Sequence, residues 1–219
     1  MTPLSFDLFW SMRSPYSYLA LDRLLEIRKR YEVEIHLRVV YPMAIRQPEF
    51  FTVGVMKHYI PYNRLDTQRW AEFLDVPFRR PIPDPIVQEL SSGIVANDQP
   101  YIYRLTRVAE LAIQNSRGME FLDQVSRMMW DGKTDNWHDG DHLAKAIDRA
   151  GLDGQAMLLQ AVSDAKKIDN AIGVHERAQE QAGHRGTPLM VFKGEPFFGQ
   201  DRIDLLLWRL KQHGLVVRS

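Results

Sequence analysis

The chain has 219 residues and not one cysteine. It can therefore form no disulfide, no thiolate metal site and no dithiol redox centre, and it has no cysteine nucleophile. Any sulfur chemistry carried out by this protein would need a thiol brought in by a ligand.

Net charge is missing as well, because 28 Lys and Arg residues balance 28 Asp and Glu residues. Without a basic field to attract phosphate or anionic lipid, we expect a small-molecule ligand, no nucleic acid and no membrane partner. No apolar run approaches the roughly 18 residues of a membrane span, and the N-terminus lacks the pattern of a signal peptide. The expected compartment is the cytoplasm.

Periodicity in the first part of the chain predicts a β-α-β unit. Apolar and polar residues alternate over 4–10 and again over 33–41, as they do in strands. Between these runs, residues 16–31 carry leucines near helical spacing and end on a basic turn. We therefore expect two parallel strands joined by a right-handed crossover helix.

The middle of the chain has a different character. A loop-like stretch contains Pro77, Pro81, Pro83 and Pro85 and is expected to be extended. Helical patterns then follow over 101–117, 119–131, 141–150 and 153–181, the last of them broken once.

The last part of the chain returns to strands. Apolar runs on either side of the turn at 193–195 predict a hairpin, and a helix follows over 201–212. The predicted fold class is α/β, a thioredoxin-like βαβ…ββα sheet with a large all-helical insertion. The expected domains are residues 1–44 plus 184–219, which form the thioredoxin-like domain, and residues 45–183, which form the loop and helical insertion.

The turn Ser14-Pro15-Tyr16-Ser17 lies where the first predicted strand meets the first helix. Ser at the N-cap followed by Pro at the first helical position is a common helix start, so capping alone explains the pattern. The functional alternative is that the helix N-terminus favours an anion, including a thiolate, to which the Ser14 hydroxyl donates.

Two further segments carry candidate residues. Thr187-Pro188 precedes the third strand, where a trans proline is the simpler interpretation. Gln200-Asp201 begins the last helix, where Asp201 either caps the helix or pairs with a ligand ammonium group. The closely spaced histidines near residue 140 flank a glycine rather than share a helical face, so no metal site is expected.

Together, these segments resemble the 2-hydroxychromene-2-carboxylate isomerase family, which belongs with the kappa-class glutathione transferases and the DsbA-like thioredoxin superfamily. The resemblance rests on FDLFWSMRSPYSYLA at 6–20 and FFGQDR at 197–202, and it covers nearly the whole chain. The turn that is C-P-H-C in DsbA-like oxidoreductases is SPYS here, so hydroxyls replace both redox sulfurs.

The resemblance implies glutathione as the cofactor and Ser14 as the catalytic residue beside its sulfur. The residues implied to contact glutathione are Pro15, Tyr16, Thr187, a cis Pro188, Gln200 and Asp201. Lys57 is the nearest match to a glutathione-binding lysine of the kappa family, although the spacing differs by about two residues, and Arg46 or Asn63 could serve instead.

The reaction implied by the resemblance is the cis-trans isomerisation of 2-hydroxychromene-2-carboxylate or hydroxybenzylidenepyruvate-type aromatic acids by reversible thiolate addition. A kappa-type glutathione transferase is one alternative, because the same thiolate could stay attached to an electrophile. A non-catalytic thioredoxin-like module that binds peptides is another. The related families also imply a homodimer.

Overall fold

A computed structural model describes residues 3–51, 53–89 and 91–218. Four strands form one mixed sheet in the order β2-β1-β3-β4. β1 and β2 are parallel, whereas β3 is antiparallel to both β1 and β4, so the predicted parallel pair and hairpin are confirmed. The strands are β1 (Leu4–Trp10), β2 (Val33–Val39), β3 (Leu189–Phe192) and β4 (Glu195–Phe198).

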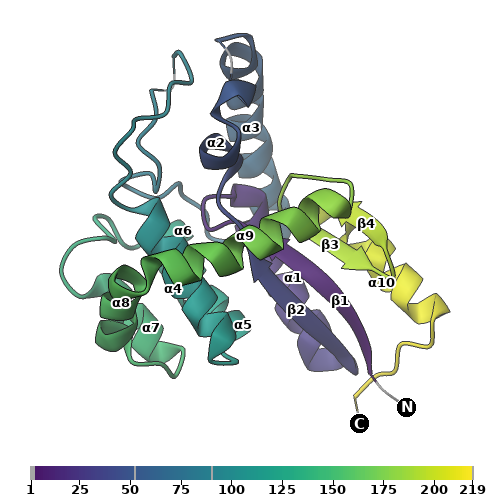
Figure 1. Cartoon of the computed structure of the whole chain (residues 1–219). Coiled ribbons are helices and arrows are strands. Elements are labelled where there is room, and N and C mark those ends of the chain that lie inside the picture. The colour runs from purple at the N-terminus through teal and green to yellow at the C-terminus, as the bar shows by residue number, and fades with distance from the viewer. Residues whose placement is uncertain (1–2, 52, 90, 219) are drawn as a thin grey trace.

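The helices cover both faces of this sheet. α9 runs across one face, and α1 and α10 lie against the other (Figure 1). The helices and helical turns are α1 (Pro15–Arg30), α2 (Met43–Arg46), η1 (Pro48–Phe50), α3 (Val53–Leu74), α4 (Ile102–Gln114), α5 (Gly118–Phe121), η2 (Leu122–Ser126), α6 (Arg127–Trp130), α7 (His142–Arg149), α8 (Gly154–Ser163), α9 (Ala165–Gln181), η3 (Gln200–Arg202) and α10 (Ile203–Gln212). None that the structure describes is both long and apolar enough to cross a bilayer.

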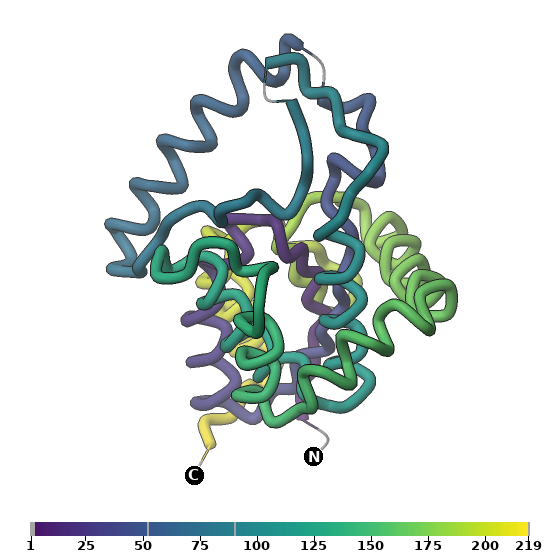
Figure 2. The backbone as a smooth tube through the Cα atoms, turned by 90° about the vertical axis from the view of Figure 1, so that its left-hand side faces the viewer, coloured from purple at the N-terminus to yellow at the C-terminus, as the bar shows by residue number. Residues whose placement is uncertain are grey.

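α3 is the one long helix that the sequence pattern did not predict. It runs for 22 residues with Pro61 inside it, although proline normally interrupts a helix. Its buried side chains are few and include the polar Asn63 and Thr67, so no apolar stripe marks the helix in the sequence. α3 lies at the upper left of Figure 2, and the proline-rich stretch runs away from its C-terminal end.

A single buried cluster holds most of the core together. It contains Phe6 and Leu8 from the sheet as well as Ile102 and Trp130 from the helices of the middle segment. Burial of such apolar surface is the main stabilising contribution to a fold of this size. The division into residues 1–44 plus 184–219 and an insertion of 45–183 stays a prediction.

Candidate functional site

The Ser14 hydroxyl lies at the junction of two segments that are far apart in the sequence. Its oxygen accepts a hydrogen bond from the Ser17 N–H (3.2 Å), which is the N-cap contact of α1. Its proton is donated to the Thr187 carbonyl at 3.0 Å. The capping interpretation is therefore correct, and the same side chain also reaches the second candidate segment.

The loop that contains Thr187 is held from several sides. The Thr187–Pro188 bond is cis, as the resemblance implies, so the simpler interpretation of a trans proline is wrong. The Pro188 carbonyl accepts a hydrogen bond from the Gly199 N–H (2.9 Å), which ties this loop to the start of the last helix. Gly199 has φ of 104°, a backbone conformation that residues with a Cβ rarely adopt, so glycine is favoured there.

His184 stabilises the approach to the same loop. Its Nδ1 accepts a hydrogen bond from the Gly186 N–H (2.9 Å), and its ring stacks on Phe198 with 3.8 Å between centroids. Burial lowers the pKa of His184, which keeps the ring in the neutral form that can accept this bond. The loop conformation at Thr187 is thus fixed by side chains from both of its flanks.

Gln200 and Asp201 differ in their accessibility. Gln200 is only 1% exposed, and its carbonyl accepts a hydrogen bond from Arg23 of α1 (2.9 Å). Asp201 is exposed and pairs with the neighbouring Arg202. Asp201 does not cap α10, which begins at Ile203 with no side-chain cap. Of the two residues, only Asp201 is exposed, and its pairing with a ligand ammonium group stays a prediction.

Pro15 and Tyr16 complete the turn at the start of α1. Pro15 is buried at the first helical position, where its missing N–H costs nothing. The Tyr16 hydroxyl donates to a carboxylate oxygen of Asp66 on α3 at 2.6 Å. Burial, followed by the hydrogen bond to Asp66, raises the pKa of Tyr16, so the phenol stays neutral. Tyr16 therefore links α1 to α3.

The three alternatives for a glutathione-binding cation or amide occupy different surroundings. Lys57 is exposed on α3. The Arg46 guanidinium donates to the backbone carbonyls of Tyr41 (2.7 Å) and Arg185 (2.9 Å), so it braces the loop before Thr187. Asn63 is buried on α3. Which of the three meets a ligand stays a prediction.

The proline-rich stretch brings polar residues to this site that no sequence pattern predicted. Arg13, next to Ser14, forms a bidentate ion pair with Asp84 at 2.7 and 3.1 Å. Arg80 donates to the side chain of Asn63 at 2.6 Å. Proline content predicted an extended stretch, but no periodic signal indicated where its charged side chains lie.

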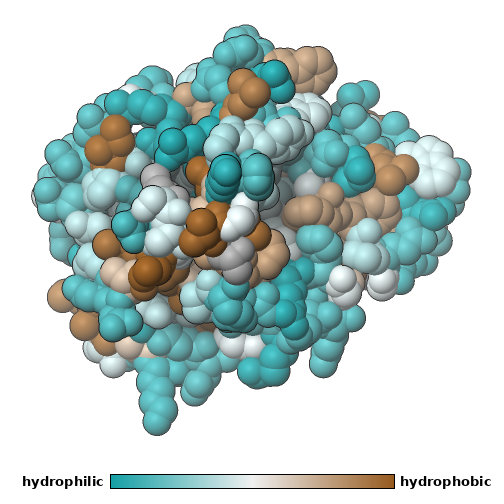
Figure 3. Space-filling view, turned by 90° about the horizontal axis from the view of Figure 1, so that it is seen from above, coloured by the Kyte–Doolittle hydropathy of each residue, from teal (hydrophilic) through white to brown (hydrophobic). Residues whose placement is uncertain are grey.

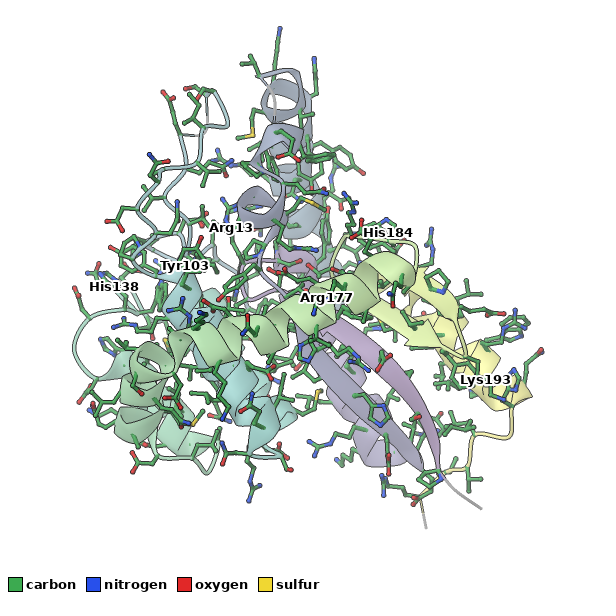
Figure 4. The ribbon with its side chains drawn as sticks, in the orientation of Figure 1. Arg13, Tyr103, His138, Arg177, His184 and Lys193 are labelled. Atoms are coloured by element: carbon green, nitrogen blue, oxygen red, sulfur yellow. The ribbon has the colours of Figure 1, made fainter. Side chains whose placement is uncertain are left out.

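The surface around these residues is mixed in polarity. Seen from above, apolar side chains gather near the middle of the face and hydrophilic ones surround them (Figure 3). Arg13 lies on one side of α2, towards the proline-rich stretch, and His184 lies on the other side (Figure 4). Across the described residues, no three His, Asp or Glu side chains are grouped so that they could hold a metal ion.

Comparison with known proteins supports the thioredoxin-like fold. The 2-hydroxychromene-2-carboxylate isomerase of Sphingobium xenophagum is 24% identical over 213 residues, which make up 91% of this chain and 94% of that protein. A solved 2-hydroxychromene-2-carboxylate isomerase has a TM-score of 0.74 at 18% identity, over 95% of both chains. The cytosolic disulfide reductase DsbM from Pseudomonas aeruginosa with GSH has a TM-score of 0.58 at 14% identity, over 95% of this chain and 100% of that one.

The family comparison covers almost the whole sequence. The family model of the DSBA-like thioredoxin domain matches residues 6–211, a range that includes both the strands and the helices between them. The thioredoxin-like fold class and the resemblance identified from the sequence are thereby confirmed. This chain belongs to the family of DsbA-like thioredoxin domains.

Proposed function

We propose that this protein is a glutathione-dependent cis-trans isomerase of 2-hydroxychromene-2-carboxylate or hydroxybenzylidenepyruvate-type aromatic acids. The observation that carries the proposal is the Ser14 hydroxyl at the N-terminus of α1, 3.0 Å from the Thr187 carbonyl, in a chain with no thiol of its own. The similarity to the isomerase of Sphingobium xenophagum supports the reaction, and the GSH of DsbM supports the tripeptide as the thiol source.

The residues of the site fit such a ligand. The N-terminus of α1 carries partial positive charge, Thr187 offers a backbone carbonyl, and the exposed Asp201 offers a carboxylate. Glutathione, when bound, supplies a thiolate that adds reversibly to a conjugated double bond and so permits rotation. Lowering a thiol pKa from about 8.5 to about 7 raises the thiolate fraction from a few per cent to roughly half, which needs about 2 kcal/mol.

The Ser14 hydroxyl has one proton to donate, so it can form a hydrogen bond either to the Thr187 carbonyl or to a bound sulfur, but not to both at once. In the structure that proton is directed at the Thr187 carbonyl, while a lone pair accepts from Ser17. A ligand amide that replaces the Ser14 hydroxyl as donor to the Thr187 carbonyl frees this hydroxyl to turn towards a sulfur without loss of the N-cap bond. Ser14 thus stabilises a thiolate without being deprotonated itself.

If glutathione is regenerated in each catalytic cycle, it is not consumed by the reaction. Reduced glutathione at a small fraction of the substrate concentration supports complete isomerisation of 2-hydroxychromene-2-carboxylate, and the free thiol is fully recovered afterwards.

In calorimetric titration, Asp201→Ala weakens glutathione binding about tenfold, because the ammonium group of glutathione loses its charged partner. Glu195→Ala, which removes another exposed carboxylate paired with an arginine, leaves the affinity unchanged.

Other outcomes separate the alternatives. A stable conjugate that forms in a one-to-one ratio with consumed thiol would identify a kappa-type transferase instead. Absence of any glutathione binding, together with saturable binding of peptides, would favour the non-catalytic module.

A further inference from the structure

Two arginines lie near one carboxylate beside the start of α1. The Arg13 guanidinium has a charged partner, since it pairs with both oxygens of Asp84, and it also donates to Gln88 at 3.1 Å. Asp84 in addition accepts the Ile86 N–H at 2.9 Å. The charge of Arg13 is therefore neutralised by a carboxylate with little hydrogen-bonding capacity left over.

Arg80 has no such partner. It is half-buried, its recorded side-chain hydrogen bond goes to the neutral amide of Asn63, and it forms no ion pair with any carboxylate of the described residues. Burial lowers the pKa of its guanidinium, Asp84 opposes this, and the positive charges of Arg13 and Arg64 add to the lowering. A partly desolvated cation whose nearest carboxylate is already paired with another arginine is costly, and an anionic ligand would reduce that cost.

α3 connects this cation to the start of α1. Asn63, which holds Arg80, lies three residues before Asp66 and so on the same side of α3. Asp66 accepts the Tyr16 hydroxyl, two residues from Ser14. Arg80 and the first turn of α1, which carries Ser14, are thus both hydrogen-bonded to the same part of α3.

The two sides of Ser14 carry different chemistry. Thr187 and Asp201, which the proposed function assigns to glutathione, lie on either side of the hairpin formed by β3 and β4. Arg80 comes from the proline-rich stretch, and its charge interacts with that of Arg13, which Figure 4 shows across α2 from His184. A ligand group at Arg80 is therefore held by a different segment from the one that carries Thr187.

We propose that Arg80, oriented by Asn63 and flanked by Arg13, binds the carboxylate of the second substrate. The inference rests on the proposed function, and it names the residue that makes the enzyme specific for acids. An arginine fork suits a carboxylate because two parallel N–H groups can donate to its two oxygens. The acid is then anchored by its carboxylate, and its double bond extends towards Ser14.

Arg80→Gln tests this assignment with two separate readouts. The KM for 2-hydroxychromene-2-carboxylate rises about 10- to 100-fold, as expected for loss of a charged hydrogen bond, whereas the Kd of glutathione is unchanged. The corresponding neutral carboxamide is turned over equally by the wild-type protein and Arg80→Gln. Arg80→Lys, which keeps the charge without the fork, recovers part of the affinity. Arg69→Gln removes an exposed arginine of α3 and serves as the matched control.

Direct binding of hydroxybenzylidenepyruvate, measured by calorimetry, separates this proposal from the proposed function. If this acid binds the wild-type protein tenfold or more tightly than Arg80→Gln, the subsite stands, even where no isomerisation is observed. Equal binding by both proteins would overturn the subsite even if the protein proves to be an isomerase. An equal loss of glutathione affinity in Arg80→Gln would also overturn it, because the bound carboxylate would then belong to the tripeptide.

Discussion

Ser14→Gly lowers glutathione-dependent turnover about 100-fold, the size of effect seen when one hydrogen-bond donor to a developing or resident negative charge is removed. The affinity for glutathione changes little, because the backbone of Thr187 and the carboxylate of Asp201 remain. Glycine is chosen because it caps a helix nearly as well as serine, so the N-terminus of α1 keeps its place. Steady-state assays at saturating glutathione measure the effect.

Two further variants at the same position separate capping from catalysis. Ser14→Ala loses the same turnover, but it also lowers the free energy of unfolding by about 1 kcal/mol, because the Ser17 N–H loses its partner. Ser14→Thr keeps a hydroxyl and retains most of the activity. If the glycine variant works at the wild-type rate while only the alanine variant is impaired, Ser14 is a helix cap and nothing more.

Trp130→Ala lowers the free energy of unfolding by about 3–5 kcal/mol, the usual cost of truncating a fully buried tryptophan. Trp130 is 2% exposed, and its ring lies nearly parallel to those of Tyr18 (6.1 Å) and Phe78 (5.8 Å). Its indole N–H donates to the Met12 carbonyl at 3.3 Å. The cavity left by alanine would thus open directly beneath the turn that carries Ser14.

The same aromatic stack positions the proline-rich stretch. The Tyr18 hydroxyl donates to the Pro77 carbonyl (2.7 Å), and the Trp130 carbonyl accepts the Arg79 N–H (2.7 Å). Urea denaturation followed by circular dichroism measures the loss, with Trp208→Ala as the control because Trp208 is 47% exposed. We expect the control to lose less than about 1 kcal/mol. An equal decrease in the free energy of unfolding in both variants would show that the aromatic stack of Trp130 stabilises the fold no more than the exposed Trp208 does.

Local patterns predicted those parts of the site that depend on neighbouring residues. The pair Ser14-Pro15 is typical of a helix start, and the turn at 193–195 between two apolar runs is typical of a hairpin. The structure confirms both predictions. The pairing of Ser14 with Thr187 required the order of the strands, because the two residues are 173 positions apart. No local pattern supplied that pairing; the resemblance implied that both segments contact the same ligand.

The rest of the site depends on contacts that leave no local signal. α3 has a proline in its interior and buries polar residues, so neither propensity nor periodicity predicts it. Arg13 and Asp84 are 71 residues apart, and their pairing follows only once the extended stretch has folded back over α1. The burial of Gln200 likewise arises from packing against Arg23, in a segment whose sequence is typical of an exposed loop.

The most direct test of a glutathione thiol at Ser14 is to place a single cysteine there. The wild-type chain has no thiol, so Ser14→Cys contains one reactive group. Its thiolate attacks one sulfur of glutathione disulfide, forms a mixed disulfide with the protein and releases one reduced glutathione. We predict that mass spectrometry shows this reaction to be saturable in glutathione disulfide, more than about tenfold faster than at the exposed Ser91→Cys, and slowed by Asp201→Ala. A rate no higher than that of Ser91→Cys, or one equal to that with hydroxyethyl disulfide, would contradict a glutathione site at Ser14.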